Sequence, residues 1–357
     1  MDVLSTQPDF GRESGKEEMT ESAQGQRGKT GSSIKKWAGF SLRVLVLAAT
    51  LFLTLMVVSS ITAADVAAET NPQEVGRMMS SLFLASLVDA TILALIVRFS
   101  RWRGLSLILG LALAFFGVQT VMGQIEALVF LTPLGENWGA GSLPMIEMPL
   151  ELIISSIISG AAKAVVGVPA AALLFGKARG RSTESIELLP TMGWRQWLLK
   201  LAGVVLLYEL LYFGFGYYVA WKSPAILEFY QGSDPGSFLA QMNHVLTETP
   251  RLAPFQAMRS LLWTAFAFPI VRMFKDKPLF GSALSGLLLG VLAFSHTIVP
   301  NPYMPDAVRQ VHLIETVSST FLFGLAQYWL FHRAHRSLAG MFGLENRSQE
   351  RSSMQAV

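Results

Sequence analysis

Residues 150–175, LELIISSIISGAAKAVVGVPAAALLF, decide the fold of this chain. An α-helix rises about 1.5 Å per residue, so a run of about 20 mostly apolar residues crosses the hydrocarbon of a bilayer. Apart from Glu151 near its start, the only charged side chain in the run is Lys163. Small residues such as Gly160 and Gly167 favour close packing against neighbouring helices. The stretch therefore predicts a membrane-spanning helix inside a bundle.

The composition of the whole chain extends this prediction. Of its 357 residues, 52% are hydrophobic and 15% are charged, whereas soluble domains carry about 25% charged residues. The sequence predicts an all-α fold, a polytopic transmembrane helix bundle with eight spans. We place these spans at about 38–61, 79–98, 104–125, 150–175, 197–221, 256–274, 279–298 and 311–332.

The basic residues give the bundle a predicted orientation. Short loops on the cytoplasmic side of membrane proteins are enriched in Lys and Arg. With the N-terminus in the cytoplasm, the loops on the outer side hold only Arg77, Lys222, Arg251 and Arg309. The inner flanks hold Lys29, Lys35, Lys36, Arg98, Arg101, Arg103, Lys177, Arg179, Arg181, Arg195, Arg272, Lys275, Lys277, Arg333 and Arg336. This asymmetry predicts eight spans with both termini in the cytoplasm of a bacterial cell, in its plasma membrane.

The ends of the chain differ in composition from the bundle. Residues 1–36 are polar and rich in Gly and Ser, so they predict a disordered cytoplasmic tail. Residues 37–333 form the expected eight-span domain, and residues 334–357 form a cytoplasmic C-terminal tail. The chain has no cysteine, which excludes disulfides and thiolate chemistry. Because no nucleotide or nucleic-acid motif is present, we expect membrane lipids as partners and no nucleic acid.

The longest outer loop, residues 222–255, carries a helix signal. Asp234 as N-cap and Pro235 at the first helical position predict a helix start, and Pro250 predicts its end. The apolar residues between them recur on one face. The pattern predicts an amphipathic helix on the outer membrane surface.

Ionisable residues within spans are costly in a bilayer and each is a functional hypothesis. Asp89, Lys163 and Glu209 fall near the centres of their expected spans. Lys163 can neutralise either carboxylate as a structural pair. Alternatively, the three residues belong to a substrate or proton pathway.

A second set of polar residues falls at the outer ends of the expected spans. His312 and Glu315 share one helix face, and Glu126, Arg259 and His296 lie at a similar depth. Imidazoles and carboxylates together are ligands for zinc or another divalent metal. We therefore expect either a metal site made of His296, His312 and Glu315, with Glu126 or Glu315 as catalytic base, or a metal-free polar cavity. The expected cavity residues are Gln124, Arg259, Tyr212, Glu209, Lys163 and Asp89.

Three classes of function fit these patterns. The first is a membrane-embedded hydrolase or lipid-modifying enzyme, with or without a metal, acting on a lipid or small molecule at the outer leaflet. The second is a small-solute transporter, in which the central and outer polar residues line one route. The third is an assembly or accessory protein whose outer polar residues only face headgroups. The enzyme is the preferred hypothesis, because the polar residues gather at one depth.

Overall fold

The structure is a computed structural model of the whole chain, and it describes residues 14–62, 71–133, 148–180, 192–230, 232, 234, 236–300 and 304–335. Within these residues the chain is all-helical. It divides into two units, residues 1–46 and 47–357. The first helix, α1 (Ser14–Thr62), contributes to both units and begins inside the segment expected to be a disordered tail. The expected tail residues 1–13 and 336–357 lie outside the described residues.

Helical backbone covers each of the eight expected spans. In the described ranges, five helical stretches are long and apolar enough to cross a membrane. They are the end of α1 (Lys36–Thr62), α2 (Pro72–Phe99), the continuous stretch of α3 (Gly104–Phe116), η1 (Gly117–Val121) and α4 (Met122–Phe130), α6 (Leu150–Leu174), and α7 (Trp194–Phe215) with η2 (Gly216–Ala220).

The other three expected spans are helical but less apolar or broken. α10 (Leu252–Met273) and α12 (Asp306–Phe331) are long enough to cross. Both carry several polar residues that are buried inside the protein, including Gln256, Arg259 and Glu315, which lowers their hydropathy. The seventh span is divided into α11 (Pro278–Gly286), η3 (Leu287–Leu292) and a short 3₁₀ turn, η4 (Ser295–Ile298). The total of eight spans and the orientation of the termini stay predictions.

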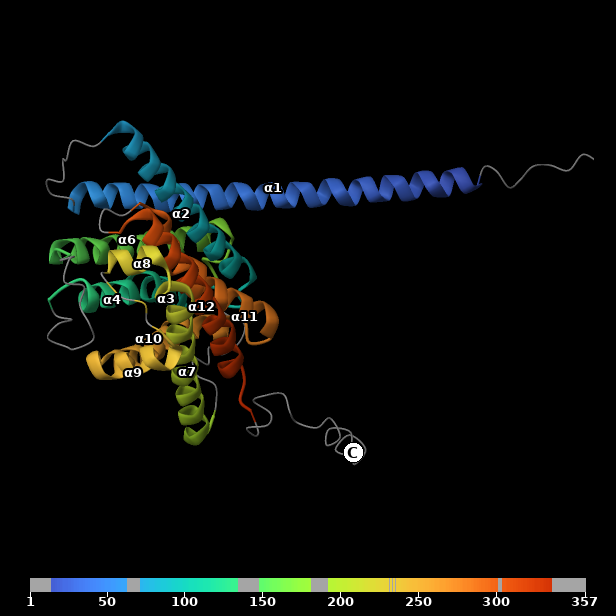
Figure 1. Cartoon of the computed structure of the whole chain (residues 1–357). Coiled ribbons are helices and arrows are strands. Elements are labelled where there is room, and N and C mark those ends of the chain that lie inside the picture. Colours follow the sequence, from blue (N-terminus) through green and yellow to red (C-terminus); the bar gives the residue numbers. More distant parts are fainter. Residues whose placement is uncertain are drawn as a thin grey trace, which may run out of the picture. The chain divides into compact units, whose positions relative to one another are not determined.

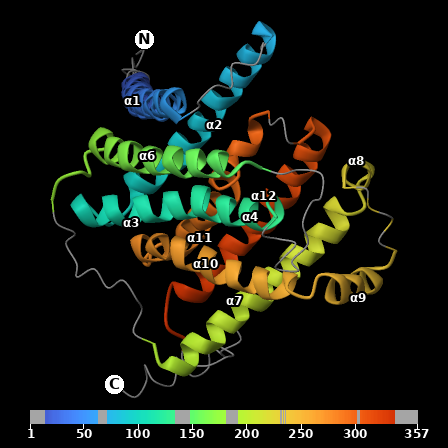
Figure 2. The same cartoon turned by 90° about the vertical axis from the view of Figure 1, so that its left-hand side faces the viewer.

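The helices of residues 47–357 cross one another in two directions. Figure 1 gives their order along the chain, and Figure 2 shows α3 and α6 running alongside each other and crossing α7 and α12. Three segments, η1, η2 and η3, are π-helical. Because a π-turn inserts an extra residue and shifts the face of the helix that follows, these segments redirect polar side chains within otherwise apolar helices.

Several helices carry apolar faces that are exposed in the part of the chain that the structure describes. On α3, Leu105, Leu109 and Leu113 recur every fourth residue and are 68%, 60% and 53% exposed. Such a stripe faces lipid when the helix lies in a membrane, because exposing it to water costs free energy. The same pattern on α7 involves Leu206 and Leu210.

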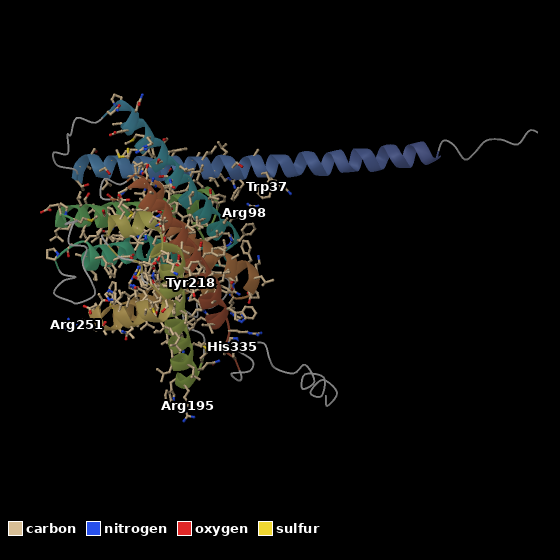
Figure 3. The ribbon with its side chains drawn as sticks, viewed as in Figure 1. Trp37, Arg98, Arg195, Tyr218, Arg251 and His335 are labelled. Atoms are coloured by element: carbon tan, nitrogen blue, oxygen red, sulfur yellow. The ribbon has the colours of Figure 1, made fainter. Side chains whose placement is uncertain are left out.

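The predicted cytoplasmic corners contact one another. The Gly104 N–H donates to the Lys177 carbonyl at 2.8 Å, and the Lys177 ammonium donates to the Ser100 carbonyl at 2.9 Å. Arg101 pairs with Asp276 in the corner between α10 and α11. Arg98 and Arg251, from opposite predicted sides, lie on opposite sides of the ribbon in Figure 3.

The outer loop 222–255 contains two helices, α8 (Pro224–Phe229) and α9 (Phe238–Glu248). The predicted start of the amphipathic helix was wrong by three residues, because Ser237 is the N-cap of α9 and its hydroxyl accepts from the Ala240 N–H at 3.2 Å. Asp234 instead accepts from the Gly236 N–H, in a turn where Gly236 has a φ of 67°. A carboxylate can close such a turn as readily as it caps a helix.

Candidate functional site

The first polar cluster, the inner network, joins side chains from four segments, α2, η1, η4 and α6, in the middle of the bundle. The Lys163 ammonium of α6 donates to Asp89 Oδ2 of α2 at 2.7 Å and to Gln119 Oε1 of η1 at 2.6 Å. The Gln119 amide lies 2.9 Å from both Asp89 carboxylate oxygens and 3.0 Å from the Leu292 carbonyl. The Ser295 hydroxyl donates to Asp89 Oδ1 at 2.7 Å. The buried charges are therefore paired and hydrogen-bonded.

The inner network settles the partner of Lys163. The lysine pairs with Asp89 and not with Glu209, whose buried Oε2 has no hydrogen-bond partner within the described residues. Gln119 and Ser295 were not among the residues expected at a functional site. Gln119 could have been identified from the sequence, because it is an amide inside an apolar run. Ser295 gave no such signal, because its position depends on where η3 ends.

The second cluster surrounds a small cavity of about 30 Å³, enough for one or two water molecules. It is lined by residues of α4, α7, α10 and α12 and by Phe294, which lies between η3 and η4. Its polar lining residues are Glu126, Tyr208, Tyr212, Arg259, Glu315, Thr316, Ser319 and Thr320. Of the residues expected at the site, the structure thus brings Glu126, Arg259, Tyr212 and Glu315 together.

One wall of this outer cavity is a fixed ion pair. Arg259 is 2% exposed and donates from one terminal nitrogen to Glu126 Oε2 at 2.7 Å and from the other to Gln256 Oε1 at 2.9 Å. A buried guanidinium needs such partners, because an unpaired charge away from water is costly. The indole N–H of Trp263 donates to the Tyr208 hydroxyl at 3.3 Å and fixes that ring beside the pair.

Glu315, which also lines the cavity, begins a hydrogen-bonded chain of three side chains. His312 Nδ1 lies 3.0 Å from Glu315 Oε2, and His312 Nε2 lies 2.9 Å from the Tyr230 hydroxyl. Burial, together with the negative charges of Glu315 and Glu126, raises the pKa of Tyr230, so its hydroxyl stays protonated at neutral pH. The chain connects a carboxylate at the cavity with a phenol in the outer loop, just after α8. Tyr230 was not foreseen, because only the folded loop brings it to α12.

The geometry does not support the expected metal site. Across the described residues there is no group of three or more His, Asp or Glu side chains placed to hold a metal ion. His312 and Glu315 contact each other, but His296 Nδ1 lies 3.1 Å from the Ala293 carbonyl of its own turn. Because η4 is a 3₁₀ turn, it directs His296 differently from the continuous helix that the sequence suggested.

The remaining expected site residues lie outside the cavity lining. Gln124 is on α4, and its buried Oε1 has no hydrogen-bond partner in the described parts of the chain. Asp89 and Lys163 belong to the inner network, and Glu209 lines neither cluster. Neighbouring residues of the chain nevertheless belong to the two clusters. Phe294 lines the cavity, and Ser295 belongs to the inner network.

Comparisons with known proteins identify no relative of this chain. No family model matches the sequence, and neither a curated protein nor a solved structure is significantly similar to it.

Proposed function

We propose that this protein is a metal-free membrane-embedded enzyme that hydrolyses or transfers an ester-linked group of a lipid or small molecule at the outer leaflet. The observation that carries this proposal is the Glu315–His312–Tyr230 chain beside the cavity. A carboxylate that orients an imidazole, whose other nitrogen faces a hydroxyl, is the arrangement of a general base. The role of Glu315 is then to orient His312 rather than to bind a metal.

The proposed reaction needs only this chain and the substrate. His312 takes the proton of an attacking water or alcohol, relayed through the Tyr230 hydroxyl, while the oxygen attacks the ester carbon or phosphorus. The same proton is then returned to the leaving oxygen. The Glu315 carboxylate stabilises the imidazolium that forms. The Glu126–Arg259 pair fixes the shape and charge of the cavity that holds the polar part of the substrate.

Lipid conversion by the purified full chain tests this proposal. The protein is reconstituted in vesicles of a bacterial lipid extract, and lipids and released products are followed by mass spectrometry. We expect the wild type to produce a new product and His312→Gln to slow its formation by about 100-fold or more, the usual contribution of a general base. His244→Gln is the matched control, because His244 is exposed on α9 on the same predicted side. If the wild type converts no lipid, or His312→Gln converts it equally well, the proposal is wrong.

A small-solute transporter is the second candidate, favoured by the adjacency of the two polar clusters at Phe294 and Ser295. In this reading a solute would pass from the cavity toward Ser295, whose hydroxyl donates to Asp89 of the Asp89–Lys163 pair. Transport predicts uptake of labelled solutes into vesicles that is retained in His312→Gln. The enzyme predicts formation of a lipid product that is lost in His312→Gln.

A further inference from the structure

The hydroxyl groups of α12 make the outer cavity a surface of hydrogen-bond acceptors. Thr316 donates its proton to the His312 carbonyl at 2.6 Å, and Ser319 and Thr320 donate theirs to the Thr316 carbonyl at 3.2 and 2.5 Å. A hydroxyl has one proton to donate but two lone pairs. Since each proton is used within the helix, the hydroxyl oxygens of these three lining residues are left as acceptors.

The carboxylate of Glu315 adds a negative charge to this acceptor surface. Glu126 and Arg259 neutralise each other at 2.7 Å, so the net charge of the cavity lining comes from Glu315. Its side chain is 11% exposed, and its hydrogen bond to His312 uses only one of its two oxygens. The terminal nitrogens of Arg259 are directed to Glu126 and Gln256, and its Nε is fully buried. The guanidinium therefore does not cancel the charge of Glu315.

Three aromatic rings complete the lining. Tyr208, Tyr212 and Phe294 contribute to the cavity, and the two tyrosine rings lie with their centroids 6.3 Å apart and an angle of 18° between their planes. Aromatic faces attract organic cations, more strongly where water is excluded. A negatively charged, acceptor-lined and partly aromatic cavity is complementary to a cation that donates several hydrogen bonds.

We propose that the outer cavity binds a primary ammonium group, through Glu315 and the α12 hydroxyls of Thr316, Ser319 and Thr320. A primary ammonium has three N–H donors, and the cavity of about 30 Å³ accommodates a group of that size. A trimethylammonium group is larger and has no N–H donor. This proposal rests on the proposed function, because it assigns the polar end of the substrate of that site. The ammonium belongs either to an aminophospholipid headgroup or to a free small amine.

Binding measurements on the purified full chain test the assignment without requiring turnover. Ethanolammonium chloride, choline chloride and sodium chloride are compared at equal ionic strength by thermal unfolding and calorimetry. We expect ethanolammonium to bind and to raise the unfolding temperature more than either other salt. Glu315→Gln weakens its binding by about tenfold or more, as expected for a lost hydrogen bond to a charged group. Thr320→Val keeps every ionised group and is expected to weaken binding several-fold. This variant tests the assignment if Glu315→Gln does not fold.

Matched controls and a lipid comparison complete the test. Ser318→Ala and Glu248→Gln change a hydroxyl residue and a glutamate that do not line the cavity. Both variants are expected to retain wild-type affinity for ethanolammonium. Stronger stabilisation in nanodiscs containing phosphatidylethanolamine than in phosphatidylcholine assigns the ammonium to a lipid, and an effect of free ethanolammonium alone assigns it to a small amine. Equal binding of choline, preference for sodium, or unchanged affinity in both Glu315→Gln and Thr320→Val overturns the assignment.

The ammonium assignment and the proposed reaction fail in different ways. Binding of ethanolammonium without any lipid product contradicts the reaction and leaves the assignment standing. Conversion of phosphatidylglycerol, which has no ammonium, at the rate of phosphatidylethanolamine contradicts the assignment and leaves the reaction standing.

Discussion

Burial determines how much each charged side chain contributes to the stability of the protein. The Asp89 and Lys163 side chains are 1% and 10% exposed, whereas those of the Arg77–Asp306 pair, 3.4 Å apart, are 61% and 48% exposed. Water screens the exposed pair, and such pairs contribute little to stability. A buried charge that loses its partner keeps the full cost of its desolvation.

Asp89→Asn is therefore expected to destabilise the protein far more than Arg77→Gln. The first substitution leaves the Lys163 charge unneutralised and lowers the free energy of unfolding by about 3–5 kcal/mol, whereas the second changes it by less than about 1 kcal/mol. Unfolding in mixed micelles with increasing denaturing detergent measures both. Similar losses in the two variants would contradict the structural role of the inner network.

The positions of individual side chains also predict the metal content of the protein. Because His296 is turned toward its own backbone and no three ligating side chains converge in the described residues, we expect no stoichiometric zinc, manganese or iron. Elemental analysis of wild type and His312→Ala, purified without chelators, measures this content. EDTA is expected to leave the unfolding temperature unchanged. About one metal ion per chain that is absent from His312→Ala would overturn the metal-free mechanism.

Glycines set how closely the helices approach. A methyl group on Gly324 of α12 would lie 2.6 Å from the Ser285 carbonyl oxygen and 2.8 Å from the Gly286 Cα of α11. These are backbone atoms, which cannot rotate away as a side chain can. A methyl group on Gly203 of α7 has no neighbour within 4 Å, so that glycine is not required by packing.

Gly324→Ala is accordingly expected to destabilise the protein by about 1–3 kcal/mol through overpacking. Gly203→Ala is expected to be neutral or stabilising by about 0.5–1 kcal/mol, since alanine loses less conformational entropy in a helix. Thermal unfolding of the two variants in the same detergent gives the comparison. Equal unfolding temperatures of Gly324→Ala and Gly203→Ala would contradict the close α11–α12 contact.

At the scale of the whole molecule, the number of crossings is the main prediction. The chain has no cysteine, so single cysteines report sidedness without a background. Glu74→Cys and Asn243→Cys, at exposed positions on the predicted outer side, are expected to react with an impermeant maleimide in intact spheroplasts. Lys277→Cys, exposed between α10 and α11, is expected to react only after permeabilisation. Labelling of Lys277→Cys in intact spheroplasts would place that corner outside and contradict the predicted topology.

The sequence by itself determined the helical class and the approximate bounds of the helices. Runs of apolar residues are a local property, and a bilayer leaves helices as the simplest way to satisfy their backbone hydrogen bonds. The same local signals placed Glu126, Arg259 and Glu315 at one depth, and the structure brings them together with Tyr212. The number of crossings rests on charge asymmetry and still awaits the labelling experiment.

Only the tertiary structure decided which polar groups meet. Lys163 had two possible carboxylate partners in the sequence, and helix packing places Asp89 beside it. The break between η3 and η4 turns His296 away from the expected metal site, and the folded outer loop brings Tyr230 to His312. These outcomes depend on helix rotation, π-turns and loop closure, which shift a side chain by several ångströms without changing the pattern of apolar residues. Spacing therefore predicts the depth of a residue in the membrane, whereas packing determines its partner.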